Sequence, residues 1–309
     1  MRYWLTVFIL ISVLPLSANA YVCSRVTTPN GPDTGPSLSW FNRVISIAIH
    51  EDGTNQIDAD EEFQAVEASY RVWEKLESIS DTCPGAVEGS TDIRFDFGAA
   101  GEIRTTSSRS VGYNYLAPDT NENIVVFWDE DWPHPSLGGV IALTTTTHIP
   151  QDGRIIDADI ELNATNFEFT NLTNANDNSS KTDLANTMVH EIGHLLGLGH
   201  TTDAQATMFA SATPGEVLKR TLDCDDINGI AFKYPAGQEN GYCSVATAGC
   251  SCVEPEPLGS VPVITQTESY DSNETGGCAA SEMLSPLGLL MALGITRRRR
   301  KRHRDVSGF

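Results

Sequence analysis

Positive charge is scarce in this sequence. Lys and Arg number 20 against 41 Asp and Glu, which gives a formal net charge of −21. Seven of the basic residues lie within 297–304, so the remainder of the chain is still more acidic. A nucleic-acid partner requires a basic face, so the composition argues against one. The acids instead indicate a solubilising surface, and some of these carboxylates could bind calcium, which prefers oxygen ligands.

Long apolar runs are also missing. Two shorter runs occur, at 4–16 and at 283–295, and each is short for a membrane span. The first follows Arg2 and precedes Ala18-Asn19-Ala20, a small-x-small cleavage pattern. We therefore expect 1–20 to be a cleaved secretory signal peptide rather than an anchor, and export implies an oxidising compartment.

The rest of the chain divides into three segments. A folded domain is expected over 21–235, and a stretch rich in Gly, Pro, Ser, Thr and acids over 236–277 is expected to be a flexible linker. The tail, 278–309, holds Cys278, the second apolar run and the basic cluster. The other six cysteines could form three disulfides, although their spacing does not reveal the pairing.

Strand patterns dominate the first part of the folded domain. They are predicted where β-branched or alternating apolar residues occur, at 44–49, 93–97, 124–128, 139–143 and 156–162. In the last of these, acids alternate with apolar residues, which predicts one face in water.

Helix patterns occur at three places: one between the first two predicted strands, and two after the last. Apolar residues spaced by three and four predict a helix over 63–73, and an N-cap at Thr182 or Asp183 begins another. A third helix should begin near Asp223 and end at Pro235. Strands mixed with helices indicate an α/β (α+β) domain.

Residues 190–200 carry the chemistry. His190 and His194 are four apart and share one face of a helix, where two imidazoles can bind one zinc ion. Gly197 can adopt a positive φ and redirect the chain, so that His200 returns as the third ligand. Three protein ligands leave the fourth tetrahedral position to water. Glu191, beside the metal rather than on it, is then the general base.

These residues resemble the metzincin zinc peptidases. The resemblance implies a twisted mixed sheet with an active-site helix and a C-terminal helix, and a later turn whose methionine packs beneath the zinc. Met208 fits that role. The acid-rich run 222–230 and Tyr234-Pro235 resemble the end of a matrixin, or matrix-metalloproteinase-like, catalytic domain, and 154–162 resembles the edge strand that pairs with an extended substrate.

The sequence departs from the matrixin pattern in several places. Residue 201 is Thr where Ser is usual, and no propeptide with an inhibitory cysteine is apparent. We expect Cys23 to pair with Cys83 instead. Asp157-Ala158-Asp159 stands where matrixins carry the histidines of a structural zinc. One catalytic zinc is therefore expected, with calcium as a further candidate ion.

The tail resembles the sorting tails of myxobacteria-like bacteria. In these, a Gly-Cys element, a short membrane helix and an Arg-rich end direct attachment to the cell surface, so a sorting enzyme would handle this segment. A plain tail anchor and a basic nucleic-acid tail are the alternatives. Under the first interpretation, the protein is secreted across the inner membrane and is then attached to the cell envelope or the cell surface through this tail, or released.

Together these patterns predict a secreted or surface-attached zinc metalloendopeptidase, acting as a monomer on proteins or peptides. The alternative is a zinc-stabilised adhesion or binding module without turnover, which would not need Glu191. The remaining domain histidines, His50, His134 and His148, are expected at the surface or in hydrogen bonds. The segment 210–220 is expected to shape the pocket for the substrate side chain that follows the cleaved bond.

Overall fold

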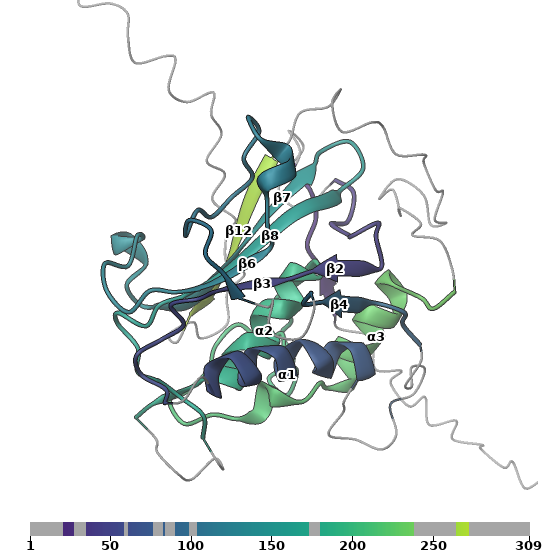
Figure 1. Cartoon of the computed structure of the whole chain (residues 1–309). Helices are drawn as coiled ribbons and strands as arrows, with labels where there is room; N and C mark the ends of the chain where they lie inside the picture. The colour runs from purple at the N-terminus through teal and green to yellow at the C-terminus, as the bar shows by residue number, and fades with distance from the viewer. Residues whose placement is uncertain are drawn as a thin grey trace, which may run out of the picture.

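The computed structural model describes residues 21–27, 35–58, 61–76, 83, 90–98, 104–172, 180–237 and 264–271 (Figure 1). The predicted signal peptide, the predicted sorting tail and most of the predicted linker lie outside these ranges. Within them, no helix combines the length and the apolar character that crossing a membrane requires.

Three α-helices and twelve strands make up the described part of the chain. The helices are α1 (Glu61–Lys75), α2 (Leu184–Leu195) and α3 (Cys224–Lys233). The strands are β1 (Val22–Cys23), β2 (Val44–Ser46), β3 (Ala48–His50), β4 (Arg94–Asp96), β5 (Arg104–Thr105), β6 (Ile124–Phe127), β7 (Val140–Ile149), β8 (Arg154–Leu162), β9 (Phe169–Thr170), β10 (Thr182–Asp183), β11 (Leu198–Gly199) and β12 (Ile264–Asp271). Short 3-10 helices cover Pro118–Thr120, Pro135–Leu137 and Leu218–Arg220.

The main sheet is mixed, with the strand order β12-β7-β8-β6-β3-β5. Strands β8, β6, β3 and β5 are mutually parallel, whereas β7 runs antiparallel to β8. Helices α1 and α2 pack against each other, and α2 also contacts β7 and β8 (Figure 1). The predicted α/β class, with an active-site helix and a C-terminal helix, is confirmed.

The strand β8 differs from the expected half-exposed strand. Asp157, Asp159 and Glu161 are all buried, with at most 2% of their surface exposed. Asp159 accepts hydrogen bonds from the backbone N–H of Gly112 and Ile124, at 2.6 and 3.0 Å. The prediction of a face in water was therefore wrong, because the chain between β5 and β6 contacts Asp159, while Trp128 and His134, which follow β6, contact Glu161.

The position of β8 in the sheet also differs from the expectation. It lies between β7 and β6, so it is an interior strand and not the edge strand predicted for 154–162. Strand β7 lies outside it and is longer than the predicted 139–143, because the threonine run at 144–147 continues the ladder to Ile149.

The expected strand 44–49 is two strands with different partners. β2 pairs in parallel with β4, while β3 pairs with β6 and β5 in the main sheet. The change of partner occurs at Ile47, whose N–H donates to Asp96 O, whereas the next N–H, from Ala48, donates to Asn123 O. The apolar pattern was correct, but the pairing depends on segments far along the chain.

Helix α2 begins as the sequence predicts and is almost wholly buried. Its N-cap is Asp183, whose side chain accepts a hydrogen bond from Asn186 N. Trp73, on the buried face of α1, donates its indole N–H to Val189 O at 2.9 Å. This contact fixes the two helices against each other beside the sheet.

A disulfide bond joins Cys83 to Cys224, so the predicted pairing of Cys23 with Cys83 was wrong. Cys23 is a free thiol in β1, which pairs with β11 and so lies close to the end of α2. The bond connects the segment after α1 to the first residue of α3.

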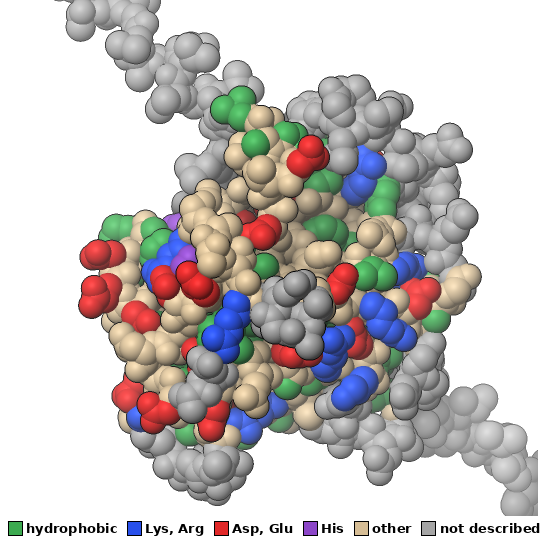
Figure 2. Space-filling model, viewed as in Figure 1, with side chains coloured by type: hydrophobic (Ala, Val, Ile, Leu, Met, Phe, Trp, Pro, Cys, Tyr) green, Lys and Arg blue, Asp and Glu red, His purple; other side chains and the backbone are tan. Residues whose placement is uncertain are grey.

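Charge on the visible face is mixed. Figure 2 shows Asp and Glu side chains scattered among Lys and Arg.

Of the predicted linker 236–277, the described residues 264–271 form strand β12, which pairs antiparallel with β7. The prediction of a flexible linker did not anticipate this strand, although Ile264, Thr265 and Thr267 are β-branched.

His148 on β7 is buried, at 1% exposure, and neither ring nitrogen has a hydrogen-bond partner among the described residues. We had expected His148 to lie at the surface or to form hydrogen bonds, and the structure shows neither among the described residues. Burial lowers the pKa of His148 to about 4, because the charged imidazolium would lose its hydration.

This histidine predicts an acid-sensitive fold. Since its pKa is lower in the folded state than in the unfolded state, its contribution to stability is lost as pH falls from about 6.5 towards 4. Between pH 7 and pH 5 the loss should be about 2 kcal/mol. Urea unfolding at both pH values should therefore show a smaller loss for His148→Leu than for wild type. Equal losses would contradict the assignment.

Candidate metal centre and active site

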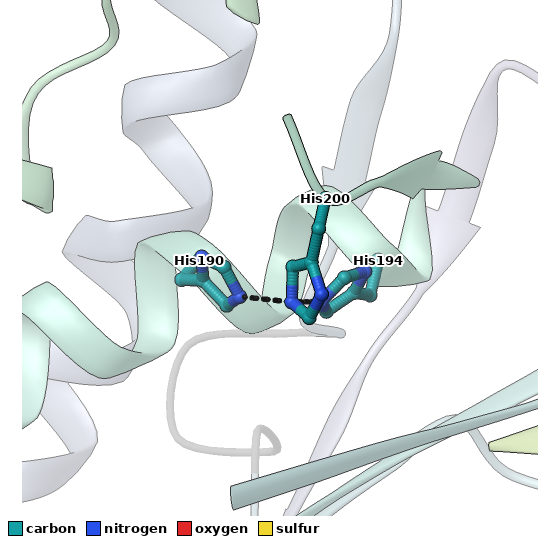
Figure 3. A group of neighbouring side chains, drawn as sticks. All are labelled: His190, His194 and His200. Atoms are coloured by element: carbon teal, nitrogen blue, oxygen red, sulfur yellow. Dashed lines mark hydrogen bonds between the residues drawn. The ribbon is translucent and has the colours of Figure 1, made fainter. Parts of the chain in front are cut away.

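The three predicted ligands converge on one point. His190 and His194 project from the same face of α2, and His200 approaches from the strand-like segment after the helix (Figure 3). His200 Nε2 lies 3.2 Å from His190 Nε2 and 3.1 Å from His194 Nε2. Among the described residues, these three form the one cluster of His, Cys, Asp or Glu side chains arranged to hold a metal ion.

Hydrogen bonds fix the tautomers of the two helix histidines. Nδ1 of His190 lies 2.6 Å from Thr207 O, and Nδ1 of His194 lies 2.9 Å from Leu198 O. Because a carbonyl oxygen only accepts, each Nδ1 must carry the proton, which leaves the Nε2 lone pair for a metal. Burial, followed by the neighbouring histidines, holds the pKa of both well below the usual range. Burial lowers the pKa of His200 to about 4.

The donor set suits zinc. In a tetrahedral site with Zn–N distances of about 2.0–2.1 Å, two ligand nitrogens are about 3.3 Å apart. The two separations from His200 are close to this value, and all three ligand atoms lie within 4.8 Å of one another. Neutral imidazoles are favoured zinc ligands, and three of them leave one position open.

The turn after α2 brings His200 back. Gly197 has φ +80°, and a Cβ on it would lie 2.3 Å from Leu38 O. The last carbonyls of the helix are satisfied by distant side chains: Trp40 Nε1 donates to Leu195 O at 2.8 Å, and the Tyr234 hydroxyl donates to Leu196 O at 2.8 Å. The sequence predicted the glycine, but not these two supports.

Glu191 is fully buried on the same helix. Its Oε2 accepts a hydrogen bond from the Thr144 hydroxyl of β7 at 2.5 Å. The same hydroxyl lies 3.2 Å from the backbone carbonyl oxygen of Glu191. Thr144 was not among the predicted site residues, because a threonine within a run of four carries no distinguishing signal.

Met208 lies beneath the site, as expected. It is buried, and its sulfur occupies the space beside Gly193, where a Cβ would approach Sδ to 2.2 Å. A larger residue at 193 would therefore displace the methionine from the helix.

A carboxylate on α3 holds the turn that contains Met208. Asp226 accepts hydrogen bonds from the N–H of Thr207 and Met208, at 2.7 and 3.1 Å, and from the N–H of Asp223 at 2.9 Å. Since Thr207 O binds His190, Asp226 supports a zinc ligand through the backbone. The acid-rich run 222–230 was recognised in the sequence, but the sequence did not reveal the contact of Asp226 with the turn that contains Met208.

The other domain histidines lie outside the cluster. His50 accepts from Asp52 N, and His134 Nε2 lies 2.9 Å from the buried carboxylate of Glu161. Trp128 donates to the other oxygen of Glu161 at 2.9 Å. The suggestion that surface carboxylates bind calcium stays a prediction.

A pocket lies beside the N-terminal half of α2. Its lining includes Asn186 and Thr187 of the helix, Ile141 of β7, and Thr213 and Glu216 from the segment 210–220. Part of the segment expected to shape a substrate pocket thus contributes to a cavity next to the active-site helix.

Taken together, the geometry defines a class. A helix with two histidines and a glutamate, a glycine turn to a third histidine and a methionine beneath them characterise zinc-dependent metallopeptidases of the metzincin type. The chain belongs to the matrixin family, whose model matches residues 39–235. The three histidines are the ligands of the catalytic zinc of that family.

Individual relatives agree with this assignment. Matrix metalloproteinase-C of Caenorhabditis elegans is 26% identical over 222 residues, covering 70% of this chain and 32% of that protein. Interstitial collagenase of Bos taurus is 27% identical over 214 residues, covering 67% and 36%. Metalloendoproteinase 1 of Glycine max is 50% identical over 56 residues, 18% of each chain. The matched region thus spans about a third of the length of the first two.

The support from Asp226 can be tested by substitution. Asp226→Ala removes the acceptor of three backbone N–H groups, so we expect a loss of roughly 2–4 kcal/mol in unfolding free energy. Zinc affinity, measured by competition with a chelator, should also fall. Asp225→Ala is the matched control, since it removes a carboxylate but leaves those bonds in place. Equal zinc affinity in all three proteins would contradict the supporting role.

Proposed function

We propose that this chain is an active, secreted metalloendopeptidase, with Glu191 as its general base and proteins as its substrates. The observation that carries the proposal is the buried Glu191 carboxylate, oriented by Thr144 and carried on the helix that supplies two zinc ligands. A binding module stabilised by zinc would need the histidines but no oriented carboxylate next to them.

The residues divide the reaction between them. His190, His194 and His200 would hold the zinc ion, which supplies Lewis-acid activation of a water and of the peptide carbonyl when bound. Glu191 accepts the proton of the attacking water and then passes it to the leaving amine. Thr144 keeps the carboxylate in the orientation that both transfers require.

The cellular setting is part of the proposal. Secretion is supported by the signal-like leader and by the disulfide between Cys83 and Cys224, a bond typical of oxidising compartments. We propose that the domain spans 21–235, acts as a monomer and is attached to the cell surface through the sorting tail at 278–309, which a sorting enzyme would process.

Replacement of Glu191 tests the catalytic assignment. Wild-type chain and Glu191→Ala should each hold about one zinc, because the three ligands are unchanged. Cleavage of an unfolded protein should fall about 10²–10⁴-fold in the variant, the usual contribution of a general base. Zinc in both proteins with cleavage by neither would favour the binding module.

Thr144 is testable as a positioning residue. Thr144→Val keeps the shape but removes the hydroxyl that binds Glu191, so kcat should fall about tenfold with zinc content and KM little changed. Thr144→Ser retains a hydroxyl and should recover most of the rate. A serine variant as slow as the valine variant would show that packing, and not the hydrogen bond, matters.

A further inference from the structure

Strand β12 covers the outer edge of β7 along nearly its whole length. The pairing is antiparallel and runs from Ile264 opposite His148 to Asp271 opposite Val140, with an irregularity between Tyr270 and Asp271. Strand β12 is the end strand of the main sheet, next to β7, although it follows α3 in the chain (Figure 1). The segment between Gly237 and β12 connects it to the catalytic domain.

The edge that β12 covers is next to the catalytic glutamate. Thr144, whose hydroxyl binds Glu191, lies on β7 directly opposite Glu268 of β12. Helix α2 contacts both β7 and β12. The backbone of β12 therefore passes the active site at the level of Glu191.

An uncovered β7 would attract an extended polypeptide. A free strand edge presents a row of N–H and C=O groups, which bind a peptide by adding it as another strand. A polypeptide added there would lie beside Glu191, as a substrate must. It would need the same backbone groups of β7 that β12 now uses.

We propose that β12 is a built-in competitor, which occupies the strand-binding edge of the cleft and keeps the intact chain latent until the segment after α3 is displaced or cut. This proposal rests on the proposed peptidase function. It names the occupant of the edge as residues 264–271 and the entering partner as an extended polypeptide.

The tether makes the competition strong. Because β12 and β7 belong to one chain, their pairing is intramolecular, with an effective concentration of about 1 mM. An external polypeptide at about 10 μM with equal intrinsic affinity would therefore occupy the edge about a hundredfold less often. Release of β12 should raise kcat/KM by roughly 10–100-fold.

Two adjacent prolines can release β12 in the full chain. Neighbouring N–H groups of a strand point to opposite sides, so one of the N–H groups of residues 266 and 267 faces β7. The double variant Gln266→Pro with Thr267→Pro therefore removes that group in either case. Ala246→Pro with Thr247→Pro is the matched control, because it places the same two prolines before β12. Thermal unfolding would confirm that both proteins remain folded.

Cleavage of an unfolded protein is the first measurement. We expect the β12 proline variant to exceed wild type by 10–100-fold in kcat/KM and the control variant to equal wild type. The peptide Ile-Thr-Gln-Thr-Glu-Ser-Tyr-Asp, added to the β12 proline variant, should restore inhibition, whereas a scrambled peptide should not. Equal rates in wild type and β12 variant, both above Glu191→Ala, would overturn the competitor and leave the peptidase standing.

Hydrogen exchange gives a readout that does not depend on catalysis. Measured in the Glu191→Ala background, the β7 amides should exchange faster once the two prolines are present, and unchanged protection would overturn the pairing. If no form cleaves more than Glu191→Ala, the peptidase function fails, and the competitor role fails with it, whatever the exchange shows.

Discussion

The structure depends on bringing three neutral imidazoles to one point inside the protein. Histidines this close would repel one another if charged, so burial must keep them neutral, and each needs its free lone pair directed inward. The carbonyls of Thr207 and Leu198 meet this requirement for His190 and His194 by accepting the other ring proton. The two carbonyls lie on either side of His200 in the chain, one in β11 and one in the turn at Thr207, so the segment that supplies the third ligand also orients the first two.

Helix α2 can hold two of these histidines in fixed positions because segments distant in the chain contact it on several sides. Trp73 of α1 binds its middle, Trp40 and Tyr234 bind its last carbonyls, and β7 supplies the hydroxyl that orients Glu191. Each of these contacts satisfies a buried polar group that would otherwise be costly. The position of the Glu191 carboxylate relative to the histidines thus depends on packing across the whole domain.

The sequence predicted the metal ligands better than the residues that hold them in position. The ligands and Gly197 could be recognised because their spacing follows from helix geometry and a positive φ, both local properties, whereas Met208 was recognised only through the resemblance to the metzincins. Thr144, the buried acids of β8 and the pairing of Cys83 with Cys224 depend on which segments meet in space. The alternation of acids and apolar residues along β8 led to a wrong prediction of a water-exposed face. Buried carboxylates that accept backbone hydrogen bonds give the same alternation in the sequence as exposed ones. For the same reason β12, in a stretch that looked like a linker, was found only in the folded chain.

The disulfide between Cys83 and Cys224 links the metal centre to the redox state of its surroundings. Cys224 is the first residue of α3, directly after the N-cap Asp223 and two residues before Asp226, which holds the turn at Met208. The covalent bond therefore restrains the same helical turn that supports the zinc ligand His190. Under reducing conditions that turn has only noncovalent support, so the rigidity of the metal centre is linked to the oxidation of these two thiols.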